Sequence, residues 1–250
     1  MSGHSKWATI KRKKAVTDAR RGKIFNQIIR EITIAAKMGG GDIAANPRLR
    51  LVVEKAKANN MPADNIKRAI QKGTGELPGT TYEEATYEAY GPSGVALIID
   101  VVTDNKTRTV SEIRHLLDRH HGKLASTGAV AYQFTRKGII TVAANPLSED
   151  ALLEIVLESG AEDLKQEEEH VMVSTPPEHF DDVRKSLEEH SIAIENAELR
   201  LVPETTVKVE GQEAQQLLKL IEVLEDHDDV QQLHSNFEVD DAVLATYSGS

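Results

Sequence analysis

The side chains with the clearest chemical potential are the lysines and arginines near the N-terminus. Residues 1–30 contain nine of them and a single acid, Asp18. Each phosphate that such a side chain neutralises releases counterions, which gives a salt-dependent affinity for a polyanion. Charge alone selects neither a base sequence nor DNA over RNA. The predicted nucleic-acid contacts are Lys6, Lys11, Arg12, Lys13, Lys14, Arg20, Arg21 and Lys23, with Arg48, Arg50, Lys67 and Arg68 as flanking contacts.

Charge is distributed very unevenly along the 250 residues. The net charge is −10, but residues 1–75 hold 17 basic and 5 acidic side chains, whereas residues 141–250 hold 6 and 27. Such asymmetry indicates a polyanion partner at the basic end. The acidic end either covers the basic face or keeps the later domains away from the polyanion, and we favour the second interpretation. A solvated helical face with no partner is the plain alternative.

Other clusters in the sequence favour structural roles over chemistry. The glycines of residues 39–41 and 73–75 lack the Lys-Ser/Thr pair or the third glycine of nucleotide-binding loops, so we expect them to end helices. The histidines of residues 115–121 are spaced too unevenly to point at one metal ion. Residues 226–229, Asp-His-Asp-Asp, are predicted to form a solvated turn. Because no catalytic motif and no cysteine is present, we expect no enzyme, cofactor, metal or small-molecule substrate.

The chain also lacks the signals of a membrane or secreted protein. No apolar run approaches the roughly 18 residues of a membrane-spanning helix. The basic residues 1–30 lack the apolar core of a signal peptide. We therefore expect a cytoplasmic protein with no membrane partner.

The basic side chains are predicted to lie on a small helical bundle. Apolar residues recur at three- and four-residue spacing from Asp18 to Met38, before three glycines. A second helix is expected to begin at Asn46-Pro47, with Asn46 as its cap, and a third after Pro62. Ser2 to Lys14 is either a fourth short helix or a flexible arm. The sequence thus predicts a three- or four-helix bundle in a domain over residues 1–80. A Gly- and Thr-rich linker at 74–81 connects it to the rest of the chain.

After the linker the pattern changes to strands that alternate with helices. A hairpin is expected over 82–90 and 95–102, then a helix over 107–120 and a strand over 129–134. Residues 138–202 then read strand-helix-strand-strand-helix-strand, the ferredoxin-like split motif, and Thr175-Pro176-Pro177-Glu178 is predicted to be a capping box for its second helix. Residues 205–239 supply one further strand-helix-strand.

These elements predict a multidomain α+β protein, with the helical bundle followed by two ferredoxin-like α/β-sandwich domains. The economical arrangement is a basic helical domain at 1–80, a ferredoxin-like domain formed by 81–136 plus 205–250, and an acidic ferredoxin-like domain at 137–204 inserted into it.

Several ordered motifs resemble one known family. They are Ser2-Gly3-His4-Ser5-Lys6-Trp7, Arg21-Gly22-Lys23-Ile24-Phe25, Asn46-Pro47-Arg48-Leu49-Arg50, Asn60-Met61-Pro62, Tyr90-Gly91-Pro92 and Thr103-Asp104-Asn105-Lys106-Thr107-Arg108. By these motifs the chain resembles the YebC family. One stretch departs from the family pattern, because His121-Gly122-Lys123-Leu124-Ala125-Ser126 replaces its usual Gly-Gly-x-Leu-Gly.

The resemblance implies a cytoplasmic, DNA-binding probable transcriptional regulator with a helical first domain and two αβ domains, the third inserted in the second. It also implies an alternative, because mitochondrial relatives are translational activators and bacterial relatives are linked to ribosomes stalled at proline-rich stretches. In that case ribosomal RNA is the partner. A third hypothesis is an adaptor that binds an acidic protein surface and no nucleic acid.

Overall fold

The computed structural model describes residues 18–143, 149–166, 170–240, 243–244 and 247. The predicted arm or helix at Ser2 to Lys14 lies outside these residues. The chain divides into two compact units, which we call unit 1 (Met1–Ala131 with Thr205–Ser250) and unit 2 (Tyr132–Glu204). Within the described residues, no helix is both long and apolar enough to cross a membrane.

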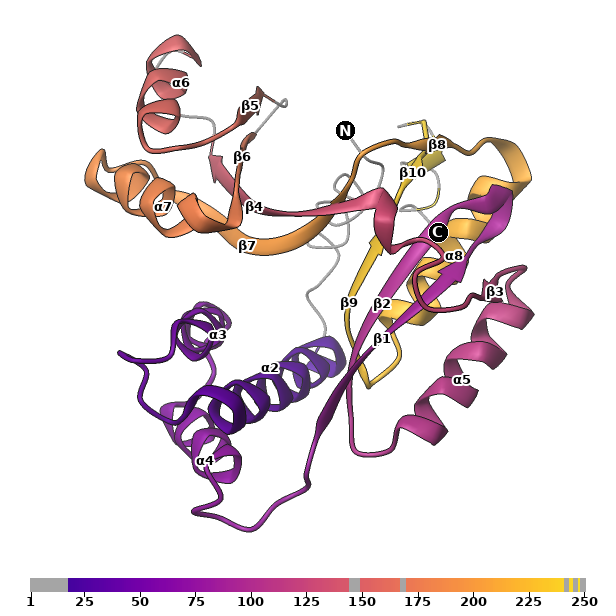
Figure 1. Cartoon of the computed structure of the whole chain (residues 1–250), viewed down its shortest axis with the longest axis horizontal. Coiled ribbons are helices and arrows are strands. Elements are labelled where there is room, and N and C mark those ends of the chain that lie inside the picture. The colour runs from indigo at the N-terminus through magenta and orange to yellow at the C-terminus, as the bar shows by residue number, and fades with distance from the viewer. Residues whose placement is uncertain (1–17, 144–148, 167–169, 241–242, 245–246, 248–250) are drawn as a thin grey trace. The chain divides into compact units, whose positions relative to one another are not determined.

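The first part of unit 1 is a helical bundle. Its helices are α2 (Asp18–Gly39), α3 (Pro47–Ala58) and α4 (Ala63–Gly73), coloured indigo to violet in Figure 1. Their apolar stripes form one buried cluster, with Ile28 and Ile32 from α2, Leu49 from α3 and Ile66 from α4 among its members. The helical periodicity of the sequence therefore predicted these three helices correctly.

Two helix boundaries follow directly from residue chemistry. Asn46 caps α3 as predicted, because its side-chain oxygen accepts a hydrogen bond from the backbone N–H of Leu49 at 3.1 Å. The Asn46 amide also donates to the carbonyl oxygens of Ala35 and Gly40, which ties the cap to the end of α2. Gly40 there has φ +84°, a left-handed conformation that glycine adopts without strain.

The second part of unit 1 is a four-stranded antiparallel sheet with two helices on one face. The elements are β1 (Glu83–Tyr90), β2 (Ala96–Thr103), α5 (Lys106–Arg119), β3 (Lys123–Leu124), α8 (Gly211–Glu225) and β9 (Val230–Ser235). The strand order is β3-β1-β2-β9, so α5 connects two strands that have β1 between them. Side chains of α5, α8 and the sheet share a second apolar cluster. This is the split arrangement of a ferredoxin-like sheet, with β1 supplying the strand that lies inside the crossover.

One strand prediction in this part was wrong, and the strand predicted at 205–209 forms but lies outside the four-stranded sheet. Residues 129–133 form a bend and one 3-10 turn (Ala131–Gln133) before β4 begins at Phe134, and the strand after α5 is β3. The backbone N–H groups of Gly128, Val130 and Ala131 donate to the Glu88 carboxylate, so they are unavailable to a strand ladder. At the C-terminal end the edge strand is β9. Residues 207–208 and 237–238 instead form a separate parallel pair, β8 with β10.

Unit 2 contains β4 (Phe134–Ala143), α6 (Glu149–Glu158), β5 (Asp163–Gln166), β6 (His170–Thr175), α7 (Phe180–Glu189) and β7 (Ile194–Pro203). The strand order is β5-β6-β4-β7, and every neighbouring pair is antiparallel. Each helix therefore connects two strands that have one other strand between them, which is the ferredoxin-like order. The fold is the predicted multidomain α+β class.

The capping box predicted at Thr175 is absent. Thr175 ends β6, and its hydroxyl donates to the carbonyl oxygens of Pro176 and Gly160, so it caps no backbone N–H. A 3-10 turn over Pro177–His179 precedes α7, and α7 begins at Phe180 without a side-chain cap.

Candidate nucleic-acid interface

The structure describes only some of the predicted phosphate contacts. Lys6, Lys11, Arg12, Lys13 and Lys14 lie outside the described residues. Arg20 and Arg21 belong to the first turn of α2, but their side chains are also outside the description. The side chains that can be placed are those of Lys23, Arg48, Arg50, Lys67 and Arg68.

One stripe of α2 contacts the αβ part of unit 1. Lys23, Gln27 and Arg30 are four and three residues apart, so they lie along one face of the helix. The Lys23 ammonium donates to the carbonyl oxygen of Glu225 at 2.9 Å and lies 3.7 Å from the Asp226 carboxylate. The Gln27 amide donates to the carbonyl oxygen of Val230 at 2.7 Å. Lys23, predicted as a phosphate contact, therefore has partners inside unit 1.

Arg30 extends this contact to a buried carboxylate, Asp229, in the turn before β9. Its guanidinium donates to Oδ1 of Asp229 at 2.6 Å, while Arg108 and Thr109 of α5 donate to Oδ2 at 2.6 and 2.7 Å. Asp229 is only 2% exposed. Burial acts to raise the pKa of its carboxyl, but the hydrogen bonds from Thr109, Arg108 and Arg30 outweigh it and hold that pKa at about 2. The prediction that residues 226–229 are a solvated turn was wrong for Asp229.

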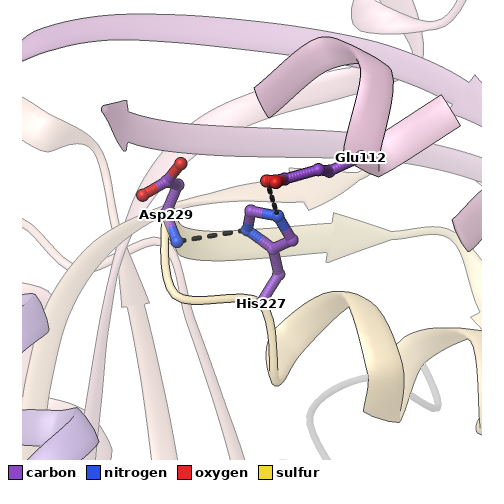
Figure 2. Close-up of side chains that lie close together, drawn as sticks. All are labelled: Glu112, His227 and Asp229. Carbon is purple, nitrogen blue, oxygen red and sulfur yellow. Dashed lines mark hydrogen bonds and ion pairs between the residues drawn. The ribbon is translucent and has the colours of Figure 1, made fainter. Parts of the chain in front are cut away.

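His227 completes the cluster in a way that argues against a metal ion (Figure 2). Its Nδ1 accepts the backbone N–H of Asp229 at 3.1 Å, and its Nε2 lies 3.0 Å from the Glu112 carboxylate. In the neutral ring the proton is therefore on Nε2, which donates to Glu112. Although Glu112, His227 and Asp229 bring three potential ligand atoms together, two guanidinium groups already bind the Asp229 oxygens. A cation at this point would meet positive charge, so these residues do not fit a metal site.

The outward cations of α3 and α4 differ in how they are paired. Arg48 forms a bidentate ion pair with Glu84 of β1. Arg50 is half-buried, and Lys67 and Arg68 are exposed. Among the described residues, no carboxylate lies within 4 Å of the charged atoms of Arg50, Lys67 or Arg68. α4 therefore carries unneutralised positive charge into solvent.

Sequence reasoning missed several residues of this surface and its support. Lys57 of α3 and Lys72 of α4 are also exposed cations, and their positions on helices already predicted were enough to find them. Arg108, Thr109 and Asp229 were missed as a group. The i, i+4, i+7 spacing of Lys23, Gln27 and Arg30 was a signal for a polar contact face, but its partner is about two hundred residues away in the chain.

Comparison with known proteins supplies the family. Residues 5–76 match the model for the TACO1/YebC protein N-terminal domain, and residues 82–237 match the model for the TACO1/YebC second and third domain. The chain belongs to the TACO1/YebC family. The sequence motifs that suggested YebC are thereby confirmed.

The relatives of this YebC-family chain are similar over almost their whole length. A protein of Gemmatimonas aurantiaca is 55% identical over 98% of this chain and 99% of its own, and one of Chlorobium luteolum is 51% identical over 98% of each. Both bear the name probable transcriptional regulatory protein. The crystal structure of a conserved hypothetical protein from Aquifex aeolicus is 47% identical, with a TM-score of 0.82 over 90% of this chain and 93% of that one. The family is thus one of regulators by the names of its members.

Proposed function

We propose that this protein is a cytoplasmic, DNA-binding transcriptional regulator whose helical bundle contacts the phosphate backbone. The observation that carries the proposal is the pairing of its cations. Lys23 and Arg30 of α2 bind residues just before β9. Lys67 and Arg68 of α4, in contrast, are exposed and form no ion pair among the described residues. The names of the relatives support a regulator.

The division of cations supports one of the two roles considered for the acidic part of the chain. Asp226 and Asp229 bind Lys23 and Arg30, and no described carboxylate of unit 1 pairs with Lys67 or Arg68. An acidic region that competed with nucleic acid for α4 would be expected to pair with Lys67 or Arg68. We therefore infer that these acids orient the bundle and do not block its outer surface.

The salt dependence of binding tests the proposal. Binding of wild type to a DNA duplex is measured by fluorescence anisotropy over a range of salt concentrations. Each lost phosphate contact should lower the slope of log K against log salt by about 0.9. We expect Lys67→Glu/Lys72→Glu, which changes two exposed lysines of α4, to reduce affinity at every salt concentration and to reduce this slope by about 1.8.

A matched control carries the same change of net charge elsewhere. Lys165→Glu/Lys219→Glu alters two exposed lysines that already lie beside Asp163 and Glu222. This variant should keep the wild-type slope. If wild type fails to bind duplex at low salt, or if both variants behave alike, the proposal is wrong.

Ribosomal RNA remains the alternative partner, because its phosphates carry the same charge and the exposed cations of α4 suit either backbone. Sedimentation of a cell lysate through a sucrose cushion at low and high salt separates the two partners. Co-sedimentation with ribosomes at low salt, together with weak and sequence-blind duplex binding, would favour the translation factor. An adaptor for acidic proteins would bind neither nucleic acid.

A further inference from the structure

The connection between α3 and α4 is short and well defined. Four residues, Asn59 to Pro62, join the two helices. The backbone N–H of Met61 donates to the carbonyl oxygen of Ala56 at 3.0 Å, and that of Asn60 to Lys57 at 2.9 Å. Asn60 has φ +57°, in the left-handed region that asparagine tolerates better than most residues. Such a turn ends one helix and redirects the chain into the next.

The residues around this turn hold both helices on the bundle core. Ala56, in the last turn of α3, is fully buried. Met61, in the turn itself, is 5% exposed, and both residues belong to the apolar core of the bundle. α3 and α4 each pack mainly on α2, and they have few contacts with each other. A helix, a turn of three or four residues and a second helix, packed in this way on a third helix, are the parts of a DNA-binding helix-turn-helix.

The outer face of α4 has the chemistry of a recognition helix. Its inner face is fixed by Ile66 and Ala69, which are buried against α2. The opposite face, about 160° wide at 100° per residue, carries three cations, one acid and two amides, which are Asp64, Asn65, Lys67, Arg68, Gln71 and Lys72. Arginine binds guanine and glutamine binds adenine at the base edges of the major groove. No large apolar side chain is exposed on this helix, so the face lacks the apolar centre that protein partners use.

We propose that α3, the Asn59–Pro62 turn and α4 form a helix-turn-helix, and that α4 enters the major groove of a DNA duplex. The inference rests on the proposed function and adds sequence readout to it. Arg68, near the middle of the outer face, and Gln71 read bases, whereas Lys67 and Lys72 at its margins bind phosphate. Duplex DNA is the occupant because its major groove admits an α-helix, while that of an RNA helix is too narrow and deep.

Selection of duplexes from a randomised pool tests this assignment. Wild type, Arg68→Ala, Gln71→Ala and Lys72→Ala are each used to enrich bound sequences, and affinities for the enriched site and its single-base variants are then measured. We expect Arg68→Ala and Gln71→Ala each to lose about 5- to 150-fold of discrimination at one base pair. Lys72→Ala should weaken binding to all sequences equally and lower the salt slope by about 0.9.

The outcomes separate this inference from the function on which it rests. If wild type binds duplex with a normal salt slope but enriches no sequence, the recognition helix is wrong and the phosphate contact stands. If Arg68→Ala and Gln71→Ala enrich the same sequences as wild type with unchanged discrimination, base reading by α4 is likewise wrong. If wild type binds no duplex, both proposals fail. Arg68 and Lys72 are exposed and Gln71 is half-buried, and circular dichroism verifies that each variant keeps the wild-type fold.

Discussion

Asp229 shows how much one side chain contributes to the geometry of unit 1. Its carboxylate accepts hydrogen bonds from α2 through Arg30 and from α5 through Arg108 and Thr109. Removal of one partner from a buried ion pair typically costs 3–5 kcal/mol, because the other charge is left without compensation. Asp229 therefore links the basic helices to the αβ part of the unit.

The low pKa of Asp229 makes this contribution depend on pH. Its folded pKa of about 2 lies below the ordinary value of 3.8, so the stabilisation is complete above about pH 4 and is lost as pH falls toward 2. At about 1.4 kcal/mol per pKa unit, the lowered pKa of Asp229 contributes on the order of 2 kcal/mol to the free energy of unfolding. We expect Asp229→Asn to be less stable than wild type at pH 7, and the difference in free energy of unfolding to shrink between pH 4 and 2. Urea unfolding across this range measures the difference.

The control for this experiment is Asp228→Asn, at the exposed neighbouring position. Its effect on the free energy of unfolding should stay below about 0.5 kcal/mol. A difference between wild type and Asp229→Asn that is the same at every pH would show that the carboxylate is not held in its charged form.

The Glu88 carboxylate holds the loop after β3 in place, as that of Asp229 holds α2 and α5 together. Burial acts to raise the pKa of its carboxyl, but backbone N–H groups of Val130, Gly128, Ala131 and Ala129 outweigh it and hold that pKa below its usual value. Glu88→Gln should lower the free energy of unfolding by about 1–3 kcal/mol, because the amide cannot accept all these hydrogen bonds. Hydrogen exchange in residues 126–131 should accelerate. Unchanged exchange there would contradict this role, and Glu189→Gln, at an exposed position at the end of α7, is the comparison.

At the scale of elements, the attachment of α4 to α2 depends on Gly73. A Cβ atom at this position would lie 2.4 Å from the carbonyl oxygen of Thr33 and 2.8 Å from Cβ of Ala36. Although alanine favours a helix by about 1 kcal/mol over glycine, overpacking typically costs 1–3 kcal/mol and a clash with backbone is hard to relieve. We expect Gly73→Ala to lower the melting temperature. Gly22→Ala in α2, where a Cβ atom meets nothing within 4 Å, should raise it slightly.

The elements that the sequence predicted correctly are those with a long periodic pattern. α2, α3 and α4 were found because apolar residues at helical spacing must face a common core, and the six helices and strands of unit 2 were found because they follow one another in a regular order. The two-residue strand β3 carries no such pattern. Residues 129–134 resembled a strand locally, but Glu88, some forty residues earlier, binds their N–H groups.

The sequence predicted which cations lie on the helical bundle, but it did not predict which of them form ion pairs. Counting charges placed the cations on the helical bundle. It could not distinguish Lys23, which contacts Glu225 and Asp226, or Arg48, which pairs with Glu84, from the unpaired Lys67 and Arg68. Such partners are far apart in sequence and meet only in the folded chain. The position of the α3–α4 turn followed from Pro62, but its conformation did not, since the left-handed φ of Asn60 is a property of the folded backbone.

At the scale of the whole molecule, the two ends of unit 2 lie side by side. The backbone N–H of Glu204 donates to the carbonyl oxygen of Gln133 at 2.9 Å, and Phe134 pairs with Pro203 at the start of β4 and the end of β7. Replacement of residues 134–203 by a short Gly-Ser linker should therefore leave unit 1 with one cooperative thermal transition. Circular dichroism and the salt slope for duplex binding measure the result. A variant without a cooperative transition would show that unit 1 needs unit 2 to fold.

The adjacency of Gln133 and Glu204 has a mechanical consequence. When the two termini are pulled apart, as by an unfolding motor, tension runs through unit 1 and reaches unit 2 only at neighbouring points of attachment. Unit 2 is thus shielded from the load until unit 1 gives way. A chain extended in an optical trap should lengthen first by the contour of unit 1 and afterwards by that of unit 2.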